Sequence, residues 1–159
     1  MKTTIFLLLI CHFAALTAND HAPVEKPIVL TAVKLDATMT KEMQKVSFDF
    51  LKMDRKGYWR VSKGYVILEY KASGRLIFQR EGDDVIAMDG KEEFDTGITV
   101  HCYGCAVGGC EPKRDKTARG YTYTCTSCNK NDNVYTGCMA SVEVPSKKIV
   151  DRETADGRF

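Results

Sequence analysis

The fold class is indicated most directly by residues 65–88, which read YVILEYKASGRLIFQREGDDVIAM. Apolar runs at 65–70, 75–79 and 84–88 follow one another with only short polar linkers between them. Each linker contains a glycine, which short hairpin loops favour because glycine adopts positive φ without steric cost. The stretch therefore predicts strands joined as an antiparallel meander.

Strand-like patterns continue on both sides of this meander. Upstream, 28–35 is a run rich in β-branched residues, and a shorter strand is expected around 58–61. Downstream, the segments 98–102, 120–125 and 134–144 have the same character. We therefore predict a mainly β protein, in which an antiparallel strand-rich domain is followed by a small cysteine-stapled β module.

Residues 39–53 fit two patterns. One helical face would carry Met39, Met43, Val46 and Phe50, with Thr40 in position to cap the helix. From residue 46 onward, apolar and polar residues alternate instead, as they do on a half-buried strand. Because the alternation begins only there and β-branched residues are few before it, we favour a strand over 46–53, with a helix as the alternative.

The chain begins like a signal peptide. Lys2 supplies a positive charge, residues 5–16 form a largely apolar segment, and Ala18 is a small residue at which a signal peptidase can cut. The apolar segment is shorter than the roughly 20 residues of a membrane span. We therefore expect residues 1–18 to be removed and the protein to be secreted or periplasmic. A retained anchor is the alternative.

Cleavage after Ala18 would leave about 141 of the 159 residues, enough for one or two small domains. We expect a loose leader over 19–27, a β-rich domain over 28–96, a cysteine-rich module over 97–144 and a disordered tail over 145–159. No later segment is apolar enough to span a membrane, so we expect no membrane span in the mature chain.

The charges are nearly balanced. Lysine and arginine total 23 against 21 acidic residues, and removing Lys2 lowers the formal net charge from +2 to +1. Acidic and basic residues alternate along the chain, so the sequence gives no electrostatic reason to expect nucleic acid or an anionic membrane surface as a partner. The expected partner is an unidentified protein or small ligand.

The cysteines are the clearest chemical feature. Cys11 of the seven would leave with the signal peptide, so six would remain. They are Cys102, Cys105, Cys110, Cys125, Cys128 and Cys138. An even number in an exported chain favours a disulfide framework, although six cysteines allow 15 pairings that sequence does not resolve.

Two other interpretations of the cysteines remain open. Cys102, Cys105, Cys125 and Cys128 have the spacing of a zinc ribbon, in which two Cys-x-x-Cys turns hold one Zn²⁺ ion. Alternatively, either Cys-x-x-Cys pair could exchange disulfides as an oxidoreductase, but both pairs follow strands rather than open a helix. The main hypothesis therefore includes no cofactor, and zinc is the alternative.

Nothing else in the sequence forms a specific site. His101 is expected to be a strand residue pointing to solvent, and Trp59 to lie in the core. No nucleophile with a partner base, acid–base pair or cofactor loop is recognisable, so no catalytic residue is assigned. The sequence thus favours an exported, non-enzymatic binding or structural protein whose ligand is unknown.

Overall fold

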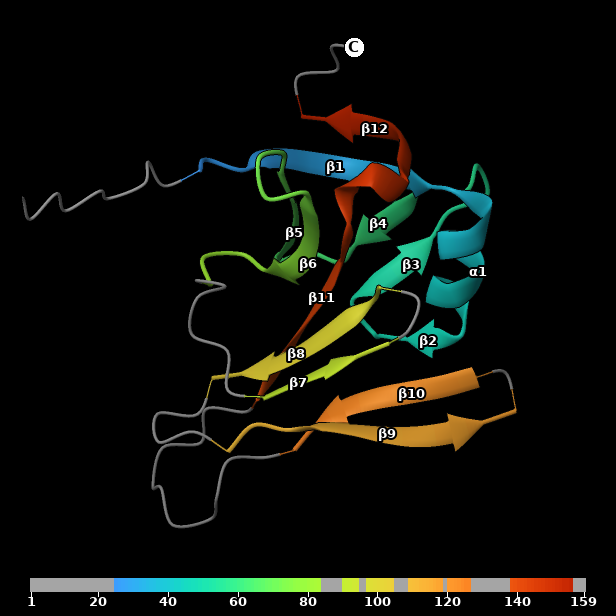
Figure 1. Cartoon of the computed structure of the whole chain (residues 1–159), viewed down its shortest axis with the longest axis vertical. Coiled ribbons are helices and arrows are strands. Elements are labelled where there is room, and N and C mark those ends of the chain that lie inside the picture. The colour runs from blue at the N-terminus through green and yellow to red at the C-terminus, as the bar shows by residue number, and fades with distance from the viewer. Residues whose placement is uncertain are drawn as a thin grey trace, which may run out of the picture.

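The computed structural model describes residues 25–83, 90–94, 97–104, 109–118, 120–126 and 138–155. Strands dominate this part of the chain. A nine-stranded antiparallel sheet curls into a half-barrel, and a three-stranded sheet lies at one end of it (Figure 1). The prediction of a mainly β protein is therefore confirmed.

The spatial order of the strands in the main sheet differs from their order in the chain. In spatial order it runs β3 (Leu51–Met53), β4 (Trp59–Val61), β1 (Ile28–Leu35), β5 (Tyr65–Tyr70), β6 (Arg75–Arg80), β11 (Met139–Pro145), β8 (Thr99–Tyr103) and β7 (Gly90–Glu93). β12 (Ile149–Thr154) also pairs with β1. Because β1 pairs with β4, β5 and β12, it joins the first and last parts of the chain.

Most of the predicted strands are present. The runs at 28–35, 65–70 and 75–79 form β1, β5 and β6, and β5 and β6 pair as the expected hairpin. The third run of the meander, 84–88, lies outside the described residues. The predicted strands around 58–61, 98–102 and 120–125 are also found, and the described part of 134–144 belongs to β11.

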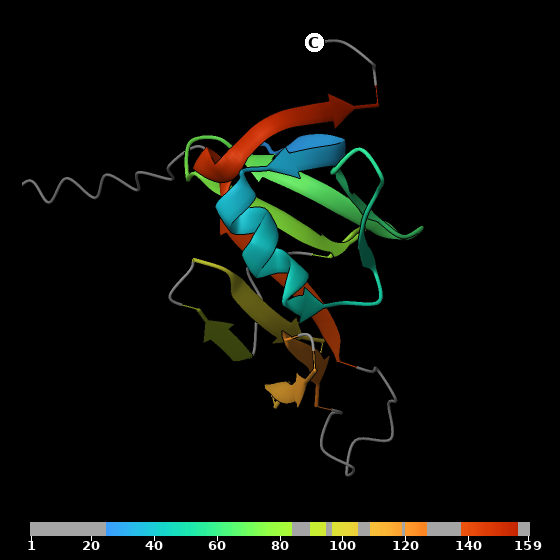
Figure 2. The same ribbon diagram turned by 90° about the vertical axis from the view of Figure 1, so that its right-hand side faces the viewer.

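The core lies on the inner face of the curled sheet. Phe78 of β6 pairs in register with Ile67 and Val142, and all three side chains are fully buried. The helix α1 (Ala37–Gln44) lies across this face and buries Met39 and Met43, which are one turn apart (Figure 2). Burial of these apolar groups supplies the main stabilisation of the fold.

The region 39–53 differs from the favoured prediction. The helix begins after Asp36, whose carboxylate accepts a hydrogen bond from Met39 N at 2.7 Å, so Asp36 rather than Thr40 caps it. The strand expected over 46–53 is divided into β2 (Val46–Ser47) and β3, with a turn between them. Among the described residues, no helix is long and apolar enough to cross a membrane.

The small sheet is built from β2, β10 (Gly120–Cys125) and β9 (Pro112–Thr117). β10 runs parallel to β2 and antiparallel to β9. Tyr121 N donates a hydrogen bond to Lys45 O at 2.6 Å and so fixes β10 beside the end of α1. The sequence did not predict β9, because its residues are charged and almost wholly exposed.

Two features of the C-terminal half correct the predicted organisation. Residues 149–154 form β12, not part of a disordered tail, because the backbone of this charged segment pairs with an edge of β1. Lys148 further holds the segment through an ion pair with Asp36 at 3.1 Å. In addition, β8 and β11 pair within the same sheet as β5 and β6, so segments 28–96 and 97–144 share one sheet.

Candidate functional site

Two disulfides join the main sheet and the small sheet. Cys102 of β8 bonds to Cys125 of β10, with Cα atoms 5.5 Å apart. Cys110 bonds to Cys138, which directly precedes β11, with Cα atoms 5.8 Å apart. The disulfide interpretation is therefore confirmed for these four cysteines, while Cys105 and Cys128 lie outside the described residues.

This pairing changes how the Cys-x-x-Cys segments are interpreted. Cys102 and Cys125 belong to different segments, and their sulfurs are bonded to each other. They therefore cannot serve as thiolate ligands of zinc, which corrects the alternative that placed them in a metal site. No cluster of metal-ligating side chains occurs among the described residues. A redox Cys-x-x-Cys would instead form its disulfide within one segment.

Disulfides are typical of proteins that fold in oxidising compartments outside the cytoplasm. The two pairs therefore indicate such an environment for this protein. Each would stabilise the fold by restricting the unfolded chain, since it closes a loop of more than 20 residues between strands.

A cleft of about 620 Å³ opens between the two sheets, beside the disulfides. Its walls come from the turn between β2 and β3, the turn before β5, the strand β10 and the start of β11. The lining residues are Ser47, Phe48, Asp49, Phe50, Ser62, Tyr65, Thr122, Tyr123, Thr124, Cys125, Cys138, Met139 and Ala140. Cys125 and Cys138 come from different disulfides, so both disulfides help to fix the cleft.

Stacked aromatic rings hold the walls of the cleft together. Phe50 stacks on Tyr65 with ring centroids 4.4 Å apart, and Phe48 contacts Phe50 at 5.5 Å and Tyr123 at 6.0 Å. This row of rings connects β5 of the main sheet to β10 of the small sheet. Each such contact contributes about 0.5–1.5 kcal/mol beyond the burial of its area.

Backbone hydrogen bonds fix the two turns that line the cleft. Ser62 N donates to Phe50 O at 2.8 Å, and Tyr65 N donates to Ser62 O at 3.1 Å. The turn carrying Phe48 and Phe50 is therefore tied to the turn before β5, and the apolar base of the cleft is preformed. The hydroxyl-bearing residues Ser47, Ser62, Thr122 and Thr124 add hydrogen-bonding capacity to its walls.

The cleft carries a single formal charge among its described lining residues. Asp49 lies between Phe48 and Phe50 in sequence, and its side chain is exposed. No hydrogen bond or ion pair joins its carboxylate to the described residues. No lysine, arginine or histidine side chain belongs to this lining. Within the described part of the chain, the site therefore presents a negative charge without an ion-pair partner, beside aromatic and hydroxyl groups.

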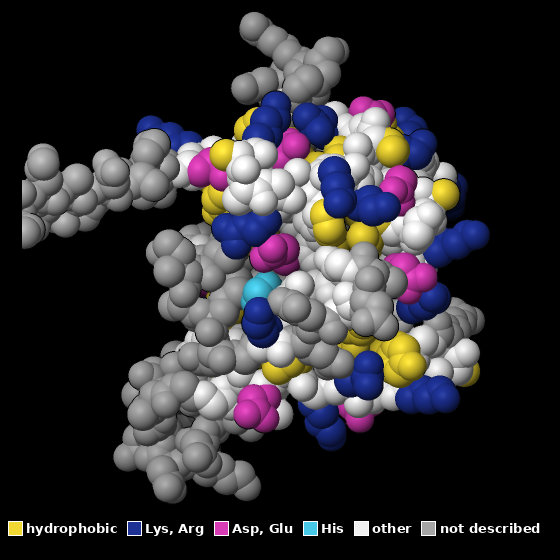
Figure 3. All heavy atoms as spheres, viewed as in Figure 1, with side chains coloured by type: hydrophobic (Ala, Val, Ile, Leu, Met, Phe, Trp, Pro, Cys, Tyr) yellow, Lys and Arg dark blue, Asp and Glu magenta, His cyan; other side chains and the backbone are white. Residues whose placement is uncertain are grey.

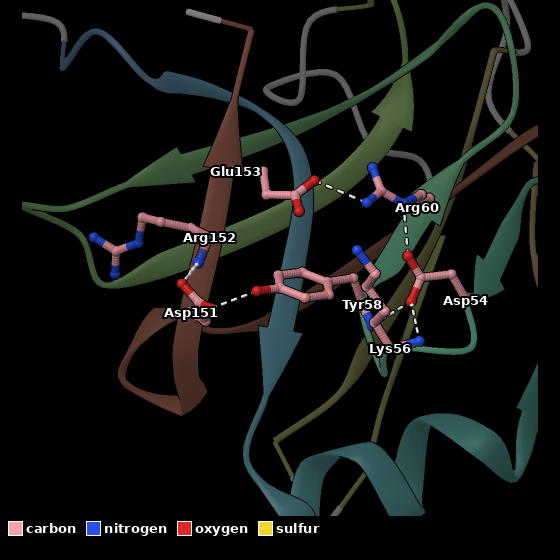
Figure 4. Close-up of polar contacts among 7 residues, drawn as sticks. All are labelled: Asp54, Lys56, Tyr58, Arg60, Asp151, Arg152 and Glu153. Atoms are coloured by element: carbon pink, nitrogen blue, oxygen red, sulfur yellow. Dashed lines mark hydrogen bonds and ion pairs between the residues drawn. The ribbon is translucent and has the colours of Figure 1, made fainter. Parts of the chain in front are cut away.

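A polar network outside the described lining of the cleft connects neighbouring strands (Figure 4). Arg60 donates hydrogen bonds to Asp54 at 2.9 Å and to Glu153 at 2.8 Å, and the Tyr58 hydroxyl donates to Asp151. These side chains reach over β1 and connect β4 with β12 (Figure 4). The charges of Arg60, Asp54 and Glu153 are paired with one another, so this network links the strands.

Hydrogen bonds within this network shift the pKa values of its acids. The hydrogen bond from Arg60 holds the pKa of Asp54 below its usual value. The hydrogen bond from Tyr58 does the same for Asp151, and correspondingly raises the pKa of the Tyr58 hydroxyl. Both carboxylates are therefore favoured in their ionised form in the folded protein.

His101 does not point to solvent as the sequence suggested. Its side chain is only 12% exposed, and Nε2 lies 3.3 Å from Glu143 Oε2 without the alignment of a hydrogen bond. Arg75 lies 3.7 Å from the same oxygen. Ser141 pairs with His101 across the strands, but its hydroxyl is fully buried and makes no hydrogen bond with the described residues. The arrangement therefore lacks the serine–histidine hydrogen bond and the access to substrate that a hydrolase needs.

Figure 3 shows one face of the molecule. Basic and acidic side chains are interspersed over the face shown in Figure 3, and apolar side chains reach it in small groups. Comparison of the chain with protein-family models, with curated proteins and with solved structures finds no match.

Sequence reasoning identified the cysteines but not the cleft. In the sequence, Phe48, Asp49 and Phe50 belong to an alternating apolar–polar pattern. Their position beside β10 depends on the parallel pairing of Val46 with Tyr121, which are distant in the chain. The available signal was a carboxylate flanked by aromatic residues within a turn, which is too common to indicate a site by itself.

Proposed function

We propose that this chain is an exported, non-enzymatic binding protein whose ligand occupies the cleft between the two sheets. The observation that carries the proposal is the cleft itself, which combines aromatic rings, hydroxyl groups and one carboxylate in about 620 Å³. Ligand sites commonly have about 300–1,000 Å³, mostly apolar walls and a few polar groups.

The scaffold supports binding because it holds the cleft in place without a ligand. Phe48, Phe50 and Tyr123 are each only 7% exposed, so they brace one another and the walls. The disulfides fix β10 and the start of β11 on the other side. A preformed site loses less conformational entropy when a ligand binds.

Binding is favoured over catalysis by the groups that the cleft offers. Asp49 is its one carboxylate among the described lining residues, and these provide neither a histidine nor a second acid to complete an acid–base pair. The disulfide between Cys102 and Cys125 joins two different Cys-x-x-Cys segments, whereas a thiol–disulfide oxidoreductase forms its disulfide within one such segment.

Export is supported by two independent features. The first residues have the charge and apolar pattern of a signal peptide, and the folded part contains disulfides. Expression of the full chain with its own N-terminus should release a protein that begins at Asn19, as determined by N-terminal sequencing. Retention of residues 1–18 in the exported protein would contradict cleavage.

The binding proposal is tested by two-dimensional NMR of the oxidised, ¹⁵N-labelled mature protein. Phenol, benzylamine, benzoate and N-acetylglucosamine serve as small probes of different charge and polarity. We expect at least one probe to shift amide resonances that cluster at 47–50, 62–65 and 122–125. If every probe leaves these resonances in place, or shifts only residues elsewhere, the cleft is not a ligand site.

A further inference from the structure

We propose that the cleft binds a lysine or arginine side chain carried by an extended segment of a partner protein, with Asp49 as the counter-charge. The inference rests on the proposed binding function and adds the class of ligand. It follows from charge complementarity, because Asp49 is the one formally charged residue of the described lining and has no partner there.

The position of Asp49 suits a cation with an apolar stem. Phe48 and Phe50 flank it in sequence and form the apolar base of the cleft, while Asp49 itself is exposed. Lysine and arginine have the matching shape, since they place a methylene stem against apolar surface and keep the charged end near water. An anionic ligand would instead bring its charge toward Asp49.

The basic residues around the cleft do not cancel this charge. Lys113 and Asp115 face Thr124 and Thr122 in the β9–β10 register, but they lie 4.0 Å apart and pair with each other. Arg114 lies over the Tyr121 ring at 5.0 Å. Arg114 pairs in register with Tyr123, which shares its face of β10 with Tyr121, so the Tyr121 ring holds the guanidinium on that side of the strand.

The size and polarity of the cleft favour a peptide over a free amine. A cleft of about 620 Å³ has room for more than one side chain. Ser47, Ser62, Thr122 and Thr124 place hydroxyl groups along its walls, and hydroxyls can both donate to and accept from peptide amide groups. An extended segment would present its backbone to these hydroxyls and a basic side chain to Asp49.

The test compares three fluorescein-labelled peptides that differ only at alternate positions, occupied by lysine, glutamine or glutamate. Fluorescence anisotropy measures their binding to the oxidised mature protein at low and physiological salt. We expect the lysine peptide to bind most tightly and to weaken as salt rises. Asp49→Asn should weaken its binding about fivefold and leave the glutamine peptide unaffected.

Glu81→Gln is the matched control, because Glu81 is an exposed carboxylate that does not belong to the described lining of the cleft. It should change binding of the lysine peptide less than twofold. Equal binding of the lysine and glutamine peptides, equal effects of the two substitutions, or no binding of the lysine peptide would overturn the inference. If the small NMR probes still shift the cleft resonances in any of these cases, the binding function stands and only its ligand class is wrong.

Discussion

Gly120→Ala should disrupt the pairing of β10 with β2 in the small sheet. Gly120 begins β10 with φ of +145°, and a Cβ there would lie 2.3 Å from Lys45 O and 2.8 Å from Lys45 Cα. These are backbone atoms, so no side-chain rotation can relieve the clash. The same Lys45 oxygen accepts the hydrogen bond from Tyr121 N that fixes β10 beside β2.

The expected loss of stability is the sum of two effects. Holding alanine at this φ costs about 1–3 kcal/mol. Moving Lys45 O away from the new Cβ also breaks its hydrogen bond with Tyr121 N, which costs about 1 kcal/mol. We therefore expect Gly120→Ala to lower the free energy of unfolding by about 3 kcal/mol.

Gly74→Ala is the control for backbone strain alone. Gly74 also has positive φ, at +68°, but no atom lies within 4 Å of where its Cβ would be. Its cost should be about 1–2 kcal/mol. Urea denaturation followed by fluorescence of the core residue Trp59 measures both values, and hydrogen exchange at Tyr121 N reports on the β2–β10 contact. Equal destabilisation by the two substitutions, with unchanged protection of Tyr121 N, would refute the reasoning.

Three further predictions concern the disulfides, the acid side of the pH range and the helix cap. The double substitution Cys110→Ala and Cys138→Ala removes a disulfide that closes a loop with a sequence separation of 28. It should lower the free energy of unfolding, measured in urea, by about 3.6 kcal/mol. A loss below about 1 kcal/mol would contradict the presence of this disulfide. The pKa of Asp54 is lower in the folded protein than in the unfolded chain, where it is about 3.9. Ionised Asp54 therefore stabilises the folded protein above about pH 3.9, and this stabilisation is lost as the pH falls through the lower pKa of the folded state. Thermal denaturation of Asp54→Asn between pH 2 and 5 should therefore show a shallower pH dependence than the wild type, and identical slopes would exclude this contribution. Asp36→Ala should destabilise the protein by about 1 kcal/mol by removing the cap of α1, whereas Asp36→Ser, which keeps an acceptor, should recover part of the loss in the same urea titration.

The strands that the sequence predicted correctly are those whose apolar residues are consecutive or alternate. β1, β5 and β6 are of this kind, and their burial in the sheet follows from that pattern. β9 and β12 are charged segments, and they are strands because their backbones pair with the edges of β10 and β1. Such pairing depends on tertiary neighbours and leaves little trace in local sequence.

The candidate site likewise combines features that the local sequence predicts with features that depend on tertiary contacts. Six cysteines in a short segment predicted disulfides, but the pairing of Cys102 with Cys125 follows from β8 and β10 lying close together in the fold. The cleft depends further on the parallel contact between Val46 and Tyr121, which no local pattern encodes. Asp49 could be recognised as a binding group only after this contact had placed it beside β10.

Two disulfides, each joining distant segments of the chain, hold the two sheets together around the cleft. Disulfide mapping of the unreduced, exported protein by proteolysis and electron-transfer mass spectrometry tests this arrangement most directly. We expect linked peptides that join Cys102 to Cys125 and Cys110 to Cys138. A bond between Cys102 and Cys105, or between Cys125 and Cys128, would contradict this arrangement and return the Cys-x-x-Cys segments to a redox role.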